Sequence, residues 1–125
     1  GGRVLIYAPT KAMSCGFVLL TSGSKGLRYM GRYASAMCHE VANMELGKLT
    51  DIKNGVRETE RLNGQLFDII DENTGNAKGF WMEKITAAKN ADLFLSPEES
   101  KAFGVIDVVG TPTVTIDVRY TLNVS

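Results

Sequence analysis

The stretch VLIYAPTKAMSCGFVLLTSGSKGLRYM, residues 4–30, decides the fold. Residues 4–8 form a short, uninterrupted apolar run, which is typical of a buried strand in a parallel sheet. After a short turn, residues 14–24 have an apolar centre and end in Ser-Gly-Ser, which predicts a helix with a glycine stop. Residues 27–30 then predict a second strand. The stretch therefore predicts strand, helix, strand, the repeating unit of α/β proteins.

The rest of the chain continues this alternation of predicted strands and helices. Ser96-Pro97-Glu98-Glu99 supplies a serine N-cap, a proline at the first helical position and a glutamate at the third. Side-chain character alternates over residues 113–124, which predicts a strand at a sheet edge. The further predicted strands are 35–40, 105–109 and 113–124, and the further predicted helices are 50–73, 77–89 and a short one from Ser96 to Gly104. The predicted fold class is α/β, in a single domain over residues 1–125.

Composition excludes several classes of protein. Of the 125 residues, 44% are hydrophobic and 22% charged, the balance of a globular domain and not of a disordered chain. Lys and Arg number 14, as do Asp and Glu, so no basic excess favours nucleic acid. No apolar run approaches the roughly 20 residues that cross a bilayer. One histidine and two separated cysteines offer no metal-binding spacing, and so few thiols favour a reducing compartment.

Ser14 is the first candidate for chemistry, because it lies between a predicted strand and a predicted helix. A serine at such a turn is accessible, and the backbone N–H groups of the helix start point toward any oxyanion formed there. The alternative is that Ser14 is only an N-cap. Cys15 and Cys38 lie near the candidate residues, and we expect both to be small buried hydrophobic side chains with inert thiols, the alternative being a redox-sensitive or cysteine-nucleophile site.

His39 and Asp92 complete a set of possible nucleophile, base and orienting group. His39 is the sole histidine and lies near the end of a predicted strand, while Asp92 precedes Leu93-Phe94-Leu95, predicted to be an apolar turn. Taken alone, each has an ordinary alternative, a surface or core histidine and a solvated loop carboxylate. Only their mutual geometry could identify a triad.

Three separated segments, in the same order, resemble the Clp protease proteolytic subunit family (ClpP-like serine peptidases). Residues 12–28, AMSCGFVLLTSGSKGLR, resemble the family's nucleophile segment, and Ser35-Ala36-Met37-Cys38-His39 resembles its strand ending in the catalytic histidine. Residues 92–107, DLFLSPEESKAFGVID, are similar to its D-x-F-L-S-x-x-E-A-x-x-Y-G-L-I-D block. The resemblance covers about residues 4–109 and implies a ClpP/crotonase-like fold in which residues 50–73 form the long handle helix.

The resemblance also implies residue roles. Ser14 would be the nucleophile, His39 the general base and Asp92 the group that orients the imidazole, with the backbone N–H of Cys15 as one oxyanion donor. An extended peptide would pair along the segment Val41, Ala42, Asn43, Met44, Glu45 and Leu46 by β-augmentation. The implied activity is that of a serine-type endopeptidase acting on peptides or unfolded proteins. No metal and no cofactor are expected in this chain.

Further expectations follow from the same resemblance. Family members have a sizeable N-terminal portion with a glycine-rich loop that gives a second oxyanion donor, and Gly1-Gly2 is too close to Ser14 to be that loop, so we expect an N-terminally incomplete version of the domain. We expect a homo-oligomeric ring or stacked rings, a Clp-type ATPase that uses ATP, no nucleic-acid or membrane partner, and a cytoplasmic location. The alternatives are a catalytically inactive ClpP-like scaffold or regulatory subunit and a crotonase-type acyl-CoA enzyme.

Overall fold

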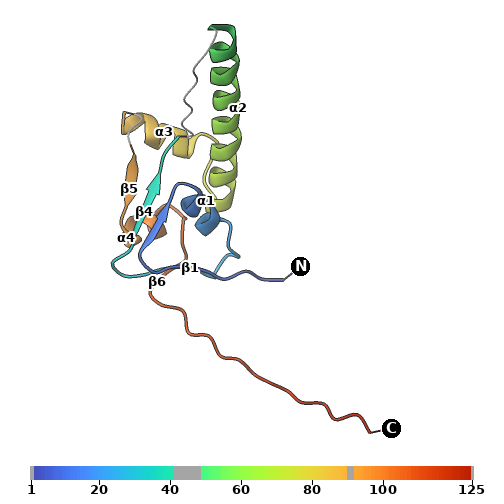
Figure 1. Ribbon diagram of the computed structural model, residues 1–125. Coiled ribbons are helices and arrows are strands. Elements are labelled where there is room, and N and C mark those ends of the chain that lie inside the picture. The colour runs from blue at the N-terminus through green and yellow to red at the C-terminus, as the bar shows by residue number, and fades with distance from the viewer. Residues whose placement is uncertain (1, 41–48, 90–91, 125) are drawn as a thin grey trace.

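The computed structural model describes residues 2–40, 49–89 and 92–124, which form two small sheets and four helices (Figure 1). The mixed α/β architecture agrees with the predicted class at this level. In chain order the elements are β1 (Ile6–Ala8), β2 (Lys11–Met13), α1 (Cys15–Thr21), β3 (Arg28–Met30), β4 (Ser35–Cys38), α2 (Leu49–Thr74), α3 (Phe80–Ala87), β5 (Leu93–Leu95), α4 (Pro97–Ala102) and β6 (Val108–Val109).

The two sheets contain three strands each. The first sheet has the order β1-β3-β6 with all strands parallel, so the strand-helix-strand prediction for residues 4–30 is confirmed by β1, α1 and β3. The second sheet has the order β2-β4-β5, in which β2 and β4 are parallel and β5 is antiparallel to β4. Because β5 runs the other way, its beginning lies at the edge where β2 and β4 end.

Four strand assignments made from the sequence were wrong. Residues 11–13 and 93–95, predicted as turns, are strands β2 and β5, because each finds β4 as a hydrogen-bonding neighbour. Only Val108–Val109 of the predicted strand 105–109 pairs, since Val105 and Ile106 are buried in the core before it. Residues 113–124 form no strand with the rest of the described chain, although their alternation is real.

Helix α1 is held by an aromatic cluster. Phe17 of α1 is fully buried and meets Trp81 of α3 edge to face, with ring centroids 5.5 Å apart. Trp81 is itself positioned from α2, because its indole N–H donates to Thr74 Oγ1 at 2.9 Å and Asp71 accepts from its backbone N–H at 3.0 Å. These contacts fix the depth of α1 against the two helices that follow it in the chain.

The helix predicted over residues 50–73 is α2. It begins at Leu49 and ends at Thr74, followed by Gly75 with a positive φ of 72°, the expected glycine stop. Where its side chains are described, the buried ones all belong to its second half, and these are Asn63, Phe67, Ile70, Asp71 and Thr74. The first half extends past the other described elements (Figure 1). Among the described helices, none has the length and hydropathy that a membrane span requires.

A buried arginine joins the ends of three helices to the first sheet. The Arg28 guanidinium, 5% exposed, forms a salt bridge with Asp107 at 2.8 Å. It also donates to the carbonyls of Thr21, Asn73 and Gly104, at or just beyond the C-terminal ends of α1, α2 and α4. A cation suits this position because helix C-termini carry partial negative charge. We call Arg28, Asp107 and these three carbonyls the arginine hub.

Candidate active site

Ser14 and His39 are brought together by the parallel pairing of β2 and β4. Met13, the last residue of β2, pairs with Met37 of β4, and the Ser14 N–H donates to the Met37 carbonyl at 3.1 Å. Ser14 follows β2 directly and His39 follows β4 directly. Carboxyl ends of neighbouring parallel strands meet at one edge of a sheet, which is where ligands bind in open α/β sheets. Two of the three candidate side chains therefore share that edge.

Ser14 lies in a strained turn that presents its side chain. Its φ is 55° and its ψ is −117°, a conformation that residues with a Cβ rarely adopt. It precedes the first residue of α1, yet its hydroxyl makes no capping hydrogen bond to that helix. The alternative that the Ser14 hydroxyl only caps α1 is therefore wrong. A serine on a strained strand-to-helix turn is the geometry of a nucleophile elbow.

The Ser14 hydroxyl is hydrogen-bonded to the imidazole of His39. The distance from Ser14 Oγ to His39 Nε2 is 2.5 Å. On the other side of the ring, His39 Nδ1 contacts the backbone carbonyl of Glu40. A carbonyl only accepts, so Nδ1 carries the proton, and in the neutral ring Nε2 is left as an acceptor for the serine hydroxyl. This is the tautomer that a general base toward Ser14 requires.

Asp92 lies next to this pair by strand register but does not bond to it. In the antiparallel pairing of β4 and β5, Cys38 is opposite Leu93, so the next position in each strand sets His39 opposite Asp92. Directly opposed residues in antiparallel strands have Cβ atoms about 5 Å apart. Nevertheless Asp92 is exposed, and it forms no hydrogen bond to His39 or to any other residue in the described ranges.

The backbone N–H of Cys15 directly follows Ser14 at the start of α1. Cys15 is the first residue of α1, so its N–H has no acceptor within the helix. The expectation that both thiols are buried was wrong for Cys15, which is exposed because it begins the helix beside the open strand edge. Cys38 is buried in β4, and that burial raises the pKa of its thiol to about 12, which makes it unreactive.

The Glu40 carbonyl is the group that sequence reasoning missed. Every residue carries a backbone carbonyl, so nothing in the amino-acid pattern could single this one out. The segment predicted to bind an extended peptide, residues 41–46, lies outside the described residues. Within the described part of the chain, no three His, Cys, Asp or Glu side chains gather where they could hold a metal ion.

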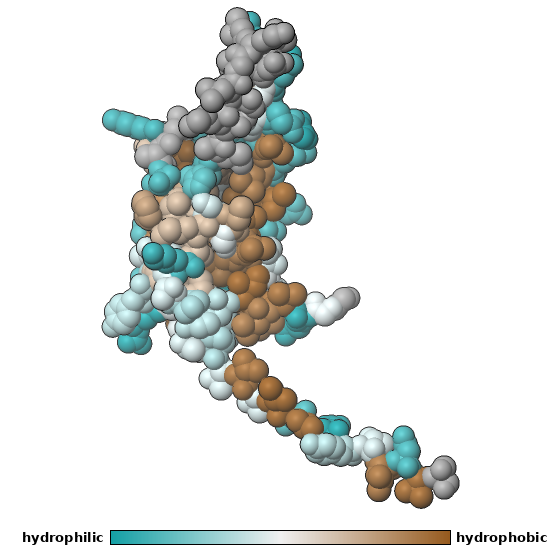
Figure 2. Space-filling model, viewed as in Figure 1, coloured by the Kyte–Doolittle hydropathy of each residue, from teal (hydrophilic) through white to brown (hydrophobic). Residues whose placement is uncertain are grey.

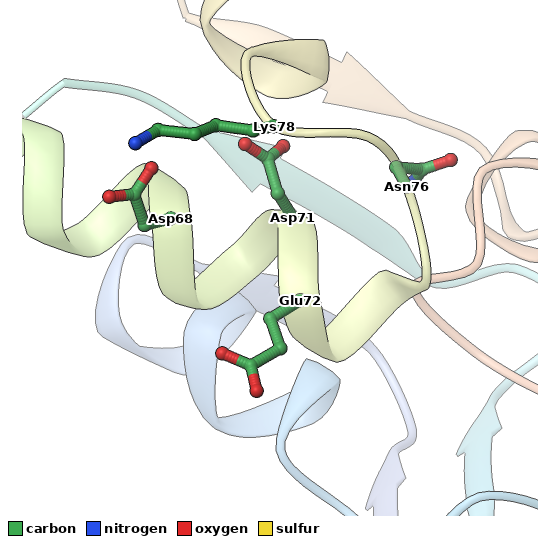
Figure 3. A pocket seen from close by; sticks show the side chains of 5 residues that line it. All are labelled: Asp68, Asp71, Glu72, Asn76 and Lys78. Carbon is green, nitrogen blue, oxygen red and sulfur yellow. The ribbon is translucent and has the colours of Figure 1, made fainter.

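A shallow pocket of about 300 Å³ lies elsewhere, where α2 meets the loop leading to α3 (Figure 3). Lys78 extends along α2 over Asp71 toward Asp68, whereas Glu72 points away from them. The Asp71 carboxylate already accepts from the backbone N–H groups of Gly79 and Trp81, so it serves to start α3. This cluster therefore has a structural explanation that does not involve a ligand.

Comparison with protein families identifies the family of the chain. The family model for Clp protease matches residues 2–113 of the chain, which is most of its length. Ser14, His39 and Asp92 all lie inside the matched range, whereas residues 114–124 lie beyond it. The match confirms the resemblance noted in the sequence. This chain belongs to the Clp protease family, a family of serine peptidases.

Proposed function

We propose that this chain is a serine-type endopeptidase subunit in which Ser14 is the nucleophile, His39 the general base and Asp92 the group that orients the imidazolium. The observation that carries the proposal is the 2.5 Å hydrogen bond between Ser14 Oγ and His39 Nε2. The strained φ of Ser14 supports it, because strain of this kind persists where function requires it. Membership of a serine peptidase family supports it independently.

The proposed reaction is acyl transfer. Ser14 Oγ attacks the carbonyl carbon of a peptide bond while its proton passes to His39 Nε2, and the Cys15 N–H donates to the oxyanion. The intermediate collapses when His39 Nε2 returns that proton to the leaving amine, which leaves an ester on Ser14. Water then attacks the ester while His39 Nε2 takes its proton, the bond between the acyl carbon and Ser14 Oγ breaks, His39 returns the proton to Ser14 Oγ, and the acid product leaves.

Asp92 acts in this scheme when the ring becomes charged. In the resting state, the Glu40 carbonyl holds Nδ1–H. A carboxylate stabilises an imidazolium more than a neutral carbonyl does, because the hydrogen bond is then charge-assisted on both sides. Since the strand register sets Asp92 opposite His39, a side-chain movement would bring its carboxylate to the ring. We propose that this movement accompanies substrate binding.

The proposed substrate is an extended segment of a peptide or unfolded protein, paired by its backbone along residues 41–46. Such pairing tolerates many sequences, because it reads main-chain groups and not side chains. We further propose a homo-oligomeric ring, or stacked rings, and a Clp-type ATPase as the partner that uses ATP. Exposed apolar residues on α2, including Leu62 and Ile69, would be covered in such an assembly.

The exposed position of Asp92 favours a second candidate, a catalytically inactive ClpP-like scaffold or regulatory subunit. A carboxylate without a hydrogen bond to His39 cannot fix the ring, and in serine peptidases loss of that group lowers turnover by about 10⁴-fold. The two candidates differ in whether Ser14 reacts as a nucleophile. They agree on the fold and on assembly.

The decisive experiment is labelling with a fluorophosphonate, which reacts with activated serines. We expect the wild-type chain to be labelled at Ser14, as located by peptide mass spectrometry, and the Ser14→Ala variant to lose both the label and peptide cleavage. Ser22→Ala is the matched control, because Ser22 is an exposed serine at the other end of α1 whose hydroxyl donates to the Leu19 carbonyl. Cleavage that survives in Ser14→Ala would contradict the proposal. A folded wild type that remains unlabelled would favour the inactive subunit.

A further inference from the structure

Residues 113–124, which we call the tail, leave the rest of the chain without pairing to it (Figure 1). Figure 2 shows apolar side chains along this segment with no other part of the protein against them. The apolar residues and their exposed fractions are Val114 69%, Ile116 79%, Val118 64%, Tyr120 93%, Leu122 87% and Val124 86%. Large apolar side chains exposed in one continuous row indicate an interaction surface.

The tail has the sequence of a strand. Apolar residues occupy every even position from 114 to 124, and polar residues occupy every odd position from 113 to 123. This period of two sets all apolar side chains on one face of an extended chain and all polar ones on the other. Val, Ile, Thr and Tyr, the residues most enriched in strands, predominate. A strand of this kind is stable only against a neighbouring strand.

The charges in the tail identify a neighbour. Its only charged residues are Asp117 and Arg119, on either side of Val118. If two tails pair antiparallel with Val118 opposite Val118, each Asp117 faces an Arg119 of the other chain. Two opposite-charge pairs then form on the polar face, symmetric about the centre.

The same register also matches the other residues. On the apolar face it sets Ile116 opposite Tyr120, an aromatic residue against a β-branched one, which is a favourable cross-strand pair. On the polar face it sets Thr115 opposite Thr121, and the two threonine hydroxyls can form a hydrogen bond with each other. Every pair obeys the twofold symmetry that a dimer of identical segments requires.

Competing registers are worse. Antiparallel pairing centred on Asp117 or on Arg119 sets like charges opposite each other, as does in-register parallel pairing. Centres on Ile116 or Tyr120 leave both charges opposite uncharged residues. Any register shifted by an odd number of residues sets the apolar side chains of one strand opposite the polar side chains of the other. The pairing centred on Val118 is the one antiparallel register that joins both charges and matches both faces.

We propose that residues 113–123 pair with the same segment of a second copy of this chain as an antiparallel two-stranded β-ribbon centred on Val118. The start of the tail is tied to the first sheet, because Thr111 Oγ1 lies 3.2 Å from the Tyr7 hydroxyl. The ribbon therefore links two chains at a defined place. A two-stranded ribbon alone is marginally stable in water, so the link is weak and depends on protein concentration. The proposal does not depend on peptidase activity.

Disulfide trapping tests the register. In a Cys15→Ser background, Val118→Cys places two thiols directly opposite each other, within the Cα separation that a disulfide bridges. Ile116→Cys is the matched control, because in this register its two copies are four positions apart, roughly 13 Å. We expect mild oxidation to give about tenfold more covalent dimer from Val118→Cys than from Ile116→Cys at equal concentration. Mixing Ile116→Cys with Tyr120→Cys should restore cross-linking, since these positions face each other.

Charge exchange tests the same pairing without cysteine. Asp117→Arg alone sets arginines opposite each other and Arg119→Asp alone sets aspartates opposite each other, so each should weaken association measured by sedimentation on the order of tenfold. An equimolar mixture of the two variants forms two opposite-charge pairs and should associate as the wild type does. Equal cross-linking at positions 116 and 118, or no recovery in the mixture, would overturn the proposal. Either result would mean that the tail binds a different partner or pairs in another register.

Discussion

The two sheets of this protein each carry a polar cluster that contains an aspartate, and the clusters differ in how completely they are bonded. On the first sheet, Asp107 accepts from the Arg28 side chain and from the backbone N–H groups of Gly26 and Arg28. On the second, Asp92 is exposed and bonds to nothing in the described ranges. Ser14, at the same edge of that sheet, has a strained backbone, and its hydroxyl makes one hydrogen bond, to His39.

The difference separates a fully hydrogen-bonded cluster from one with bonding capacity left over. In the arginine hub, the buried guanidinium bonds to a carboxylate and to three helix-end carbonyls, so a ligand would find little left to bind. At the edge of β2 and β4, the proposed nucleophile Ser14, the proposed base His39 and the exposed Asp92 carboxylate still have hydrogen-bonding capacity. Buried polar groups with complete hydrogen bonding stabilise a fold, whereas incompletely bonded ones at a sheet edge are available for chemistry.

The substitution with the largest expected effect is Asp92→Asn, and the quantity it changes is turnover. We expect peptide cleavage to fall by about 10³- to 10⁴-fold, because a neutral amide cannot stabilise the His39 imidazolium. The free energy of unfolding should stay unchanged, since the Asp92 side chain is exposed and unbonded in the described structure. Cleavage rates with a fluorogenic peptide and urea denaturation measure the two quantities. Full activity in Asp92→Asn would mean that the Glu40 carbonyl suffices to orient the ring.

The matched substitution in the other sheet, Asp107→Asn, should show the opposite pattern. It leaves the Arg28 guanidinium buried without its counter-ion, which we expect to cost about 3 kcal/mol of unfolding free energy. Glu58→Gln serves as a control, because the Glu58–Arg61 ion pair on α2 is more than half exposed and should contribute little. An Asp107→Asn protein as stable as the wild type would show that the carbonyls alone hold Arg28.

The acid stability of the fold should also depend on Asp107. Hydrogen bonds from the Arg28 side chain, followed by those from backbone N–H groups, lower the pKa of Asp107 from its usual 3.8 to about 2. A carboxyl whose pKa is depressed in the folded state stabilises the fold fully above its unfolded pKa, and this contribution is lost as the pH falls to the folded one. The unfolding free energy of the wild type should therefore decrease between about pH 4 and pH 2. The decrease should be smaller in Asp107→Asn, and equal slopes in the two proteins would contradict the assignment.

The sequence predicted the parts of the fold that local patterns determine. The capping box that begins α4 is present, with Ser96 accepting from the Glu99 N–H and Glu99 accepting from the Ser96 N–H. Helix α2 appears within one residue of its predicted ends. Strands β2 and β5 were missed because their pairing with β4 defines them, whereas the equally short β1 and β3 lie within the segments 4–8 and 27–30 whose own pattern predicts strands.

The site was predicted unevenly for the same reason. Ser14 and His39 meet because β2 and β4 pair in a register that no single segment encodes. The family resemblance named both residues, but the tautomer of His39 depends on the Glu40 carbonyl, which has no signature in the sequence. The tail shows the converse case. Its alternation predicted a strand, but within the described chain it has no pairing neighbour and forms none, so the pattern alone was not sufficient.

The smallest expected effect concerns one hydroxyl in the core between the sheets and α4. Ser100 is fully buried, and its Oγ has no hydrogen-bond partner among the described residues. Ser100→Ala removes a desolvated polar group and introduces the best helix former, so we expect a gain of about 1 kcal/mol in unfolding free energy. For a domain of this size that corresponds to a rise of about 4 °C in Tm, measurable by differential scanning calorimetry.

Ser22→Ala provides the comparison for this last change, since the Ser22 hydroxyl is exposed and already donates to the Leu19 carbonyl. It should leave Tm unchanged or lower it slightly, whereas Ser100→Ala should raise it. Loss of stability in Ser100→Ala would show that the hydroxyl is bonded in solution, for example to a buried water. Ser100 would then be fully hydrogen-bonded, as the groups of the arginine hub are. Of the three places compared, only the edge with Ser14, His39 and Asp92 would then have hydrogen-bonding capacity left over, as the proposed substrate site requires.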